Sequence, residues 1–161
     1  MTTTTALLTL DGVRVGAELP PLRYDVSATT VVLGALATRD WRPQHHDYHF
    51  ATERNGVRDI FLNAPNQAAW FERFVTDWTG PRGRLGRVGF RMKDSVFPGD
   101  TMTISGTVTD VGVDDHGCGW VSLELSMHAR DRLCTTCTAR VALPTSPDDN
   151  PWRRSGDAWK P

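Results

Sequence analysis

The chain has 161 residues, enough for one domain with a substantial core and short for two independent ones. Its 18 basic and 19 acidic side chains give a formal net charge of −1, so nothing in the composition points to nucleic acid or an anionic membrane as a partner. Three cysteines cannot all pair within one chain, and we expect reduced thiols.

The N-terminal stretch Met1–Leu8 has no basic residue before its short apolar run. A signal peptide needs a basic start and a membrane span needs about 20 apolar residues, so we expect neither and assign the protein to the cytoplasm. We divide the chain into an N-terminal lead (1–18), a main domain (19–143) and a polar C-terminal tail (144–161). The tail is rich in proline and charge, which favours disorder over the alternative that it caps a partner subunit.

The first regular element is predicted after Pro20–Pro21, where residues 22–26 alternate between apolar and polar side chains like a half-buried strand. A short helix should follow, with Ser27 or Thr29 as its N-cap. This helix leads into a polar loop over residues 38–47.

A longer helix is predicted between Asn63 and Gly80. Asparagine is a good N-cap, Pro65 is tolerated in a first turn, and glycine followed by proline ends a helix. Apolar side chains recur within this segment at helical spacing and predict a mostly buried helix: Ala68, Phe71, Val75 and Trp78.

Four later runs alternate with a period of two, as antiparallel strands do, and turn-like segments separate them. They lie at residues 88–92, 102–108, 121–127 and 137–143. Together with the long helix they predict an α+β fold, a single domain in which an antiparallel sheet wraps around that helix.

The polar loop holds the residues most suggestive of chemistry. Asp40 and His45 are joined by a short segment containing Pro43, so a carboxylate and an imidazole can converge on one water molecule as paired acid and base. The alternative is a buried Asp–His hydrogen bond that only fixes the loop. A metal site of Asp40, His45 and His49 is a weaker interpretation, because no fourth ligand is evident, and we predict no metal.

These residues resemble the motif of the MaoC-like, (R)-specific enoyl-CoA hydratases of the hot-dog fold. That motif places an aspartate, then a proline, then a histidine five positions after the aspartate, then another acidic residue. Asp40, Pro43, His45 and Asp47 match it, and the turn Phe97–Thr101 is similar to a proline-glycine-aspartate turn of that fold. The resemblance covers the main domain and implies that it is a single hot-dog domain.

Four segments are similar, more specifically, to the small subunit of actinobacterial steroid-side-chain enoyl-CoA hydratases: Ala37–Asp40, His45–Asp47, Asp59–Asn63 and Val75–Pro81. The resemblance implies a hydro-lyase that hydrates a trans-2-enoyl-CoA to a (3R)-hydroxyacyl-CoA, with a bulky acyl group such as a steroid side chain. Coenzyme A is then part of the substrate and no cofactor is implied. The partner is a second copy or, as in that subgroup, a larger MaoC-like subunit.

The wider family opens its buried helix with a glycine-rich, histidine-containing segment, whereas this chain has Asn63, Ala64, Pro65 and Asn66 there. Free N–H groups and the helix dipole at such an N-terminus can stabilise an enolate-like thioester oxygen. We therefore predict Asn63, Ala64 and Asn66 as substrate-binding residues, beside the alternative that Asn63 is only the helix cap. Two other functions stay open: a hot-dog acyl-CoA thioesterase, and a non-catalytic partner of another MaoC-like protein.

Two further groups of residues call for an interpretation. Arg82, Arg84 and Arg87 follow the long helix and are candidates for contacts with the phosphates of coenzyme A, with a solvated loop as the alternative. Cys134 and Cys137 have an odd spacing on a predicted strand, so their side chains should point to opposite faces. We expect ordinary packing for both thiols.

Overall fold

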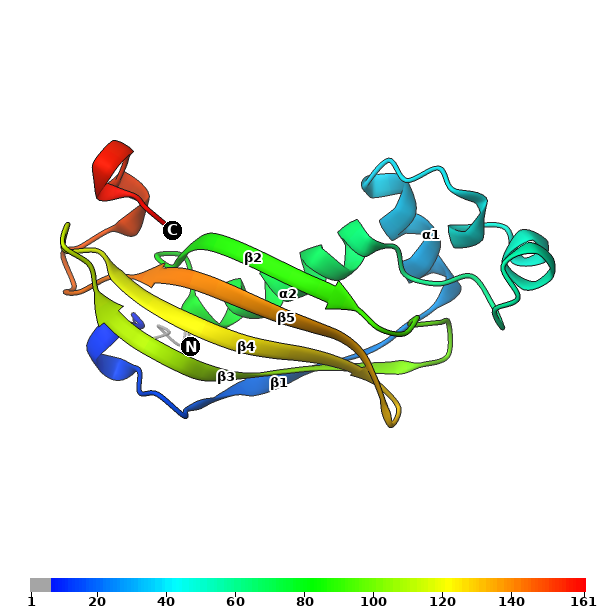
Figure 1. Ribbon diagram of the computed structural model, residues 1–161, viewed down its shortest axis with the longest axis horizontal. Coiled ribbons are helices and arrows are strands. Elements are labelled where there is room, and N and C mark those ends of the chain that lie inside the picture. The colour runs from blue at the N-terminus through cyan, green and yellow to red at the C-terminus, as the bar shows by residue number, and fades with distance from the viewer. Residues whose placement is uncertain (1–6) are drawn as a thin grey trace, which may run out of the picture.

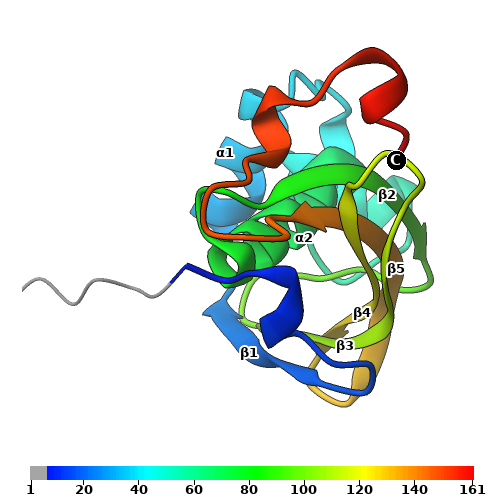
Figure 2. The same cartoon turned by 90° about the vertical axis from the view of Figure 1, so that its left-hand side faces the viewer.

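The computed structural model describes residues 7–161, and the expectations for residues 1–6 lie outside the described residues. Five strands form one antiparallel sheet in the order β1-β3-β4-β5-β2. The strands are β1 (Glu18–Asp25), β2 (Arg84–Met92), β3 (Thr101–Val113), β4 (Gly119–Ala129) and β5 (Arg132–Leu143). The sheet curls around helix α2 (Ala64–Thr79), as Figure 1 and Figure 2 show. This arrangement confirms the predicted α+β architecture.

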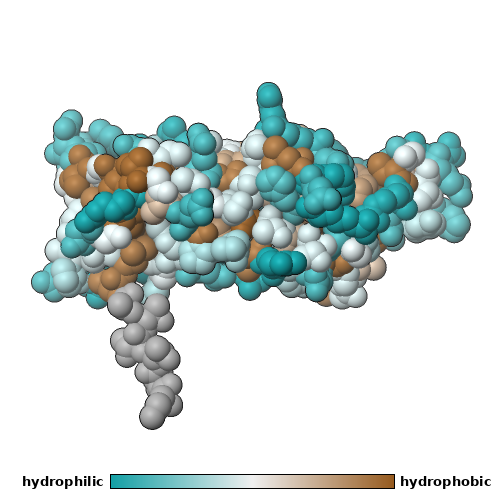
Figure 3. All heavy atoms as spheres, turned by 90° about the horizontal axis from the view of Figure 1, so that it is seen from below, coloured by the Kyte–Doolittle hydropathy of each residue, from teal (hydrophilic) through white to brown (hydrophobic). Residues whose placement is uncertain are grey.

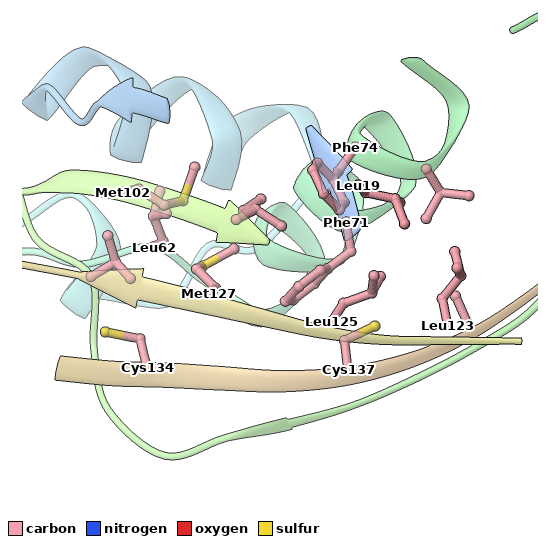
Figure 4. Close-up of a cluster of buried hydrophobic side chains, with 14 of the residues drawn as sticks. Leu19, Leu62, Phe71, Phe74, Met102, Leu123, Leu125, Met127, Cys134 and Cys137 are labelled. Carbon is pink, nitrogen blue, oxygen red and sulfur yellow. The ribbon is translucent and has the colours of Figure 1, made fainter. Parts of the chain in front are cut away.

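Helix α2 begins and ends where the sequence predicts. The Asn63 side-chain oxygen accepts a hydrogen bond from the Asn66 N–H at 3.2 Å, and Gly80, with φ of 68°, ends the helix. Phe71 and Phe74 point into the main core beside side chains of the sheet (Figure 4). The opposite face is exposed at Ala69, Glu72, Arg73, Thr76 and Asp77. The helix is therefore amphipathic and less buried than predicted.

A small lobe of the chain extends past one end of the sheet (Figure 1). It contains helix α1 (Ala28–Ala37), the 3-10 turn η2 (Pro43–His45) and the π-helical turn η3 (Phe50–Arg54). Ser27 caps α1, one of the two predicted possibilities, because its hydroxyl accepts a hydrogen bond from the Thr30 N–H at 3.1 Å. The loop with both candidate acid–base residues follows α1 directly.

Strand β1 starts earlier than predicted and contains both prolines. Its register with β3 shifts between Leu19 and Leu22, so Pro20 and Pro21 lie at an irregularity of the ladder. Because β1 is an edge strand, the missing N–H groups need not face a neighbouring strand. The prediction that the prolines precede the strand is therefore wrong.

Strand β5 places Cys134 and Cys137 in the same core, so the prediction of opposite faces is also wrong. The register with β4 shifts between Met127 and His128, which leaves Cys134 as the extra residue of a bulge. Both thiols are buried and free, and Figure 4 shows them on the same side of the strand. Burial raises the pKa of Cys137 to about 12. An inert, packed thiol is the result, as expected.

The C-terminal tail folds back onto the sheet, so the expectation of disorder is wrong. It forms the 3-10 turns η4 (Pro151–Arg153) and η5 (Gly156–Ala158). The Trp159 ring lies 4.9 Å from the Trp120 ring, and the Arg84 guanidinium lies 3.6 Å above Trp159. Aromatic and cation–π contacts of this kind hold a segment that its composition alone describes as polar.

The face of the molecule in Figure 3 carries hydrophobic residues in separate groups among hydrophilic ones. No helix formed by residues 7–161 is both long and apolar enough to cross a bilayer. A cavity of about 810 Å³ lies on the outer face of the sheet, and every strand contributes to its lining. Its polar side chains are Glu18, Arg91, Ser105, Thr107, Glu124, Ser126, Thr136 and Thr138.

Candidate active site

Asp40 is placed by the way helix α1 ends. The Arg39 N–H donates to the Leu36 carbonyl at 3.1 Å and the Asp40 N–H donates to the Ala35 carbonyl at 2.9 Å, a pair of bonds that closes a helix. Arg39 adopts the left-handed conformation, with φ of 56°, which glycine usually fills. The chain therefore turns sharply, and the Asp40 side chain is left 19% exposed beside η2.

His45 lies opposite this carboxylate. Its Nε2 is 3.6 Å from Asp40 Oδ2, and its side chain is only 4% exposed. His45 Nδ1 lies 2.8 Å from the Phe61 carbonyl oxygen, which can only accept, so Nδ1 carries the hydrogen. In the neutral ring Nε2 then presents a lone pair towards Asp40. The two atoms are too far apart for a direct hydrogen bond, and both are free to accept one from the same small molecule.

Asp40 is held by hydrogen bonds from two directions. Asn63 Nδ2 donates to Asp40 Oδ2 at 3.0 Å and also to Thr38 Oγ1 at 2.8 Å, while the Arg42 N–H donates to Asp40 Oδ1 at 3.3 Å. The Asn63 hydrogen bond is the main reason that the pKa of Asp40 lies below its ordinary value, against an opposing contribution from desolvation. At neutral pH Asp40 is therefore a carboxylate.

The N-terminus of α2 uses most of its polar groups within the fold. The Asn63 amide both caps the helix and holds Asp40, and the Asn66 N–H is the group that it caps. Asn66 Nδ2 donates to the Thr30 carbonyl at 3.4 Å and packs on Gly34, where a Cβ would lie 1.8 Å from that nitrogen. Within residues 7–161, the Ala64 N–H has no hydrogen-bond partner. Among the three predicted substrate-binding residues, Asn63 and Ala64 each keep a backbone N–H with no hydrogen-bond partner within residues 7–161.

His49, the third member of the alternative metal site, faces away from the pair. Its side chain is 81% exposed and lies 3.1 Å from Glu53, whereas His45 is buried. No group of three or more His, Cys, Asp or Glu side chains within residues 7–161 is placed to hold a metal ion.

Comparison with known proteins places this geometry in a family. The chain is 41% identical over 97 residues to the beta subunit of 3-oxo-4,17-pregnadiene-20-carboxyl-CoA hydratase from Mycobacterium tuberculosis (strain ATCC 25618 / H37Rv), an alignment that covers 60% of this chain and 74% of the relative. The chain belongs to the MaoC-like hot-dog hydratases. No family model matches the sequence.

Two solved structures show the same fold as this MaoC-like chain. A chain of the ChsH1-ChsH2 complex from Mycobacterium tuberculosis superposes with a TM-score of 0.73 at 32% identity, over 81% of this chain and 98% of that one. The (R)-hydratase from A. caviae involved in PHA biosynthesis superposes with a TM-score of 0.72 at 23% identity, over 82% and 98%. The predicted hot-dog fold is confirmed.

The MaoC-like chain uses its predicted phosphate-binding arginines elsewhere. Arg82 donates to the Pro147 carbonyl, Arg84 donates to two tail carbonyls, and Arg87 donates to the Pro161 oxygen at 2.8 Å. All three arginines therefore hold the C-terminal tail. The alternative of a solvated loop does not describe them, and their contact with the phosphates of coenzyme A stays a prediction.

Two residues that matter to the dyad were missed from the sequence. Thr38 lies in a segment that resembles the steroid subgroup, but its bond to Asn63 depends on how α1 and α2 pack. Phe61 fixes the His45 ring through its backbone carbonyl, which every residue possesses. No sequence signal could have identified Phe61 in this role.

The dyad of this MaoC-like chain lies at an open end of the molecule. Neither of the two cavities described for residues 7–161 is lined by Asp40 or His45. Large apolar side chains of α1 and of the loop that carries Asp40 and His45 are exposed: Leu33 (57%), Leu36 (43%), Trp41 (65%) and Tyr48 (54%). Asp40 and His45 are therefore ordered next to exposed apolar side chains.

Proposed function

We propose that this chain is the catalytic small subunit of an enoyl-CoA hydratase, which adds water to a trans-2-enoyl-CoA and gives a (3R)-hydroxyacyl-CoA. The observation that carries the proposal is the geometry of the pair: Asp40 Oδ2 and His45 Nε2 are held 3.6 Å apart, each side chain by its own separate hydrogen bond. A purely structural Asp–His pair would be expected to bond directly, which this one does not.

The two acceptors suit a single attacking water. One hydrogen of that water bonds to Asp40 and the other to His45, which leaves an oxygen lone pair directed at C3 of the substrate. As the C3–O bond forms, the dyad takes one proton from the water. The same dyad then delivers a proton to C2, so that H and OH add to one face and the substrate gains one water in all. We assign the proton to the pair and not to one member.

The negative charge that develops on the thioester oxygen needs a donor. The Ala64 N–H supplies one at the first turn of α2, a helix of 16 residues whose dipole adds positive potential there. Asn63 and Asn66, the other two predicted substrate-binding residues, then act by holding Asp40 and by joining α2 to α1. The side chains of Asn63 and Asn66 thus contribute to binding indirectly.

A larger MaoC-like subunit is the partner that we propose, and a bulky apolar acyl group is the substrate. The relative in Mycobacterium tuberculosis is named as a beta subunit of a hydratase for a steroid-derived CoA thioester, and the similar solved chain comes from a two-component complex. The exposed apolar side chains of α1 and of the loop that follows it fit the same arrangement, because a partner and an acyl group would cover them.

The decisive experiment is a hydratase assay with crotonyl-CoA and a steroid side-chain enoyl-CoA, run with this chain alone and with a larger MaoC-like subunit. We expect a product heavier by one water, formed only by the complex with the steroid substrate. Release of free coenzyme A would instead identify a thioesterase. Full activity of a complex carrying Asp40→Ala and His45→Ala would make this chain a non-catalytic partner.

A further inference from the structure

Three arginines converge on one buried carboxylate at the turn between β2 and β3. The Asp100 side chain is 0% exposed and lies within 2.7 Å of Arg58, 3.0 Å of Arg130 and 3.2 Å of Arg132. Asp100 also accepts the Phe97 N–H at 3.0 Å. Arg58 comes from the segment before α2, whereas Arg130 and Arg132 come from the turn between β4 and β5, and the carboxylate fixes all three in one cluster.

The arginine cluster has positive charge and hydrogen-bond donors to spare. Asp94 is the second carboxylate in contact, through Arg132, so three guanidinium groups face two carboxylates. Arg58 and Arg130 each use one nitrogen on Asp100, and their side chains are 45% and 62% exposed. Their remaining nitrogens have no partner within residues 7–161 and open to solvent. A guanidinium held in place with open donors is well suited to a phosphate group.

The cluster lies close to the dyad. The Arg58 guanidinium lies 4.4 Å above the Phe97 ring, the Phe97 ring is 6.1 Å from the Phe61 ring, and the Phe61 ring is 4.9 Å from the His45 ring. Two aromatic rings therefore separate the cluster from the candidate active site. An extended pantetheine arm is longer than two such rings, so a thioester at the dyad can place its nucleotide end at the cluster.

We propose that Arg58 and Arg130, preordered by Asp100 with Arg132, bind the phosphates of the coenzyme A thioester. This inference rests on the proposed function for its ligand and gives that ligand a second anchor. It also explains how the chain can bind the nucleotide although Arg82, Arg84 and Arg87 hold its own tail. Arg132, which contacts both carboxylates, mainly positions the other two.

The test uses Arg130→Gln, because Arg130 is the most exposed member and its loss leaves Asp100 with Arg58, Arg132 and the Phe97 N–H. Calorimetric titration of the complex with coenzyme A, 3′-dephospho-coenzyme A and pantetheine separates the phosphates from the rest of the ligand. We expect a Kd for coenzyme A about tenfold higher in the variant and an unchanged Kd for pantetheine, since charged hydrogen bonds contribute on this scale. The dephospho compound tells which phosphate is bound.

The matched control is Arg73→Gln, which removes the same charge from the exposed face of α2, where Arg73 forms an ion pair with Asp77 and lies 5.1 Å above the Trp70 ring. It should leave all three affinities unchanged. Equal effects of Arg130→Gln on coenzyme A and pantetheine, no effect on either, or failure of the unaltered complex to bind coenzyme A would overturn the inference.

Hydratase assays on the same variants keep the two proposals apart. If the unaltered complex hydrates no enoyl thioester but binds coenzyme A through Arg130, the proposed reaction fails and the phosphate site stands. If the complex is an active hydratase whose KM for the enoyl-CoA does not change in Arg130→Gln, the phosphate site fails alone. A raised KM with an unchanged kcat supports both.

Discussion

The two ends of the molecule differ: the C-terminal tail lies at one end, and α1 with the loop that follows it lies at the other (Figure 1). At one end the C-terminal tail covers the sheet, and Trp159 packs between Arg84 and Trp120. At the other end Asp40 and His45 are held by a closed set of hydrogen bonds, yet Trp41 beside them is 65% exposed. The tail covers Trp120, which is 3% exposed, although Trp152 in the tail itself is 59% exposed, whereas nothing in residues 7–161 covers Trp41 where we propose a substrate and a partner.

The largest effect that this comparison predicts follows the replacement Asp40→Asn. The amide keeps the size of the side chain but cannot accept a proton, so kcat/KM of the complex should fall about 100- to 10,000-fold, the usual range for a lost acid–base group. The midpoint of thermal unfolding should change little, because Asp40 is partly exposed. Steady-state kinetics and a melting curve measure the two effects. An active variant would remove the dyad from the reaction.

The pair Asn63→Asp and Asn63→Ser tests how the dyad is held. Both replacements keep a good N-cap, but each removes the amide donor that lowers the pKa of Asp40, and aspartate adds a second charge beside it. A raised pKa means that Asp40 gains a proton at a higher pH on acidification. The acidic limb of the kcat/KM profile should move to higher pH, by about one unit or more for aspartate and by less for serine.

An unchanged acidic limb in both Asn63 variants would show that the bond to Asp40 does not set its protonation. A merely structural role predicts a lower melting temperature with no movement of the pH profile. The two variants therefore separate positioning from folding.

Gly34→Ala is expected to disturb the end of the molecule that holds Asp40 and His45, although it changes neither residue. The new Cβ would lie 1.8 Å from Asn66 Nδ2, so either the Asn66 side chain turns away and loses its bond to the Thr30 carbonyl or α1 moves away from α2, at a cost of about 1–3 kcal/mol in the free energy of unfolding. Since α1 carries Asp40 at its end, activity should fall as well. Gly112→Ala is the control, because a Cβ there meets no atom within 4 Å. Urea denaturation of both variants gives the comparison.

The smallest effect is expected at the tail end, where Trp159→Ala should lower the free energy of unfolding by about 1–2 kcal/mol and leave kcat/KM unchanged. Trp41→Ala should behave in the opposite way: little change in stability, and weaker activity on a bulky enoyl-CoA than on crotonyl-CoA. Equal behaviour of the two variants would contradict the contrast between a closed end and an open one.

The features of the fold that depend on neighbouring residues were predicted from the sequence, whereas those that depend on long-range contacts were not. The cap at Asn63, the end of α2 at Gly80 and the four later strands depend on neighbouring residues, and they are confirmed. The place of Cys134 depends on a bulge set by the pairing with β4, and the tail on contacts with Arg84 from another strand. Such contacts join residues far apart in sequence, so spacing alone cannot reveal them.

The candidate site shows the same limit. The approach of Asp40 to His45 was predicted because a short loop joins them. Asn63 was predicted to contact the substrate. In the structure its side-chain amide donates to Asp40 from the start of another helix, α2. The cluster around Asp100 was not predicted, since its three arginines meet only when separate turns pack together.

The left-handed conformation of Arg39 lowers the stability of the fold but helps to fix the position of Asp40. A side chain in the left-handed region costs roughly 1 kcal/mol, and glycine at this position would relieve it. Anyone engineering a more heat-resistant form of the protein would therefore choose Arg39→Gly early. The same change would give the backbone next to Asp40 more freedom. The variant would then be more stable, but its Asp40 carboxylate would be less well positioned.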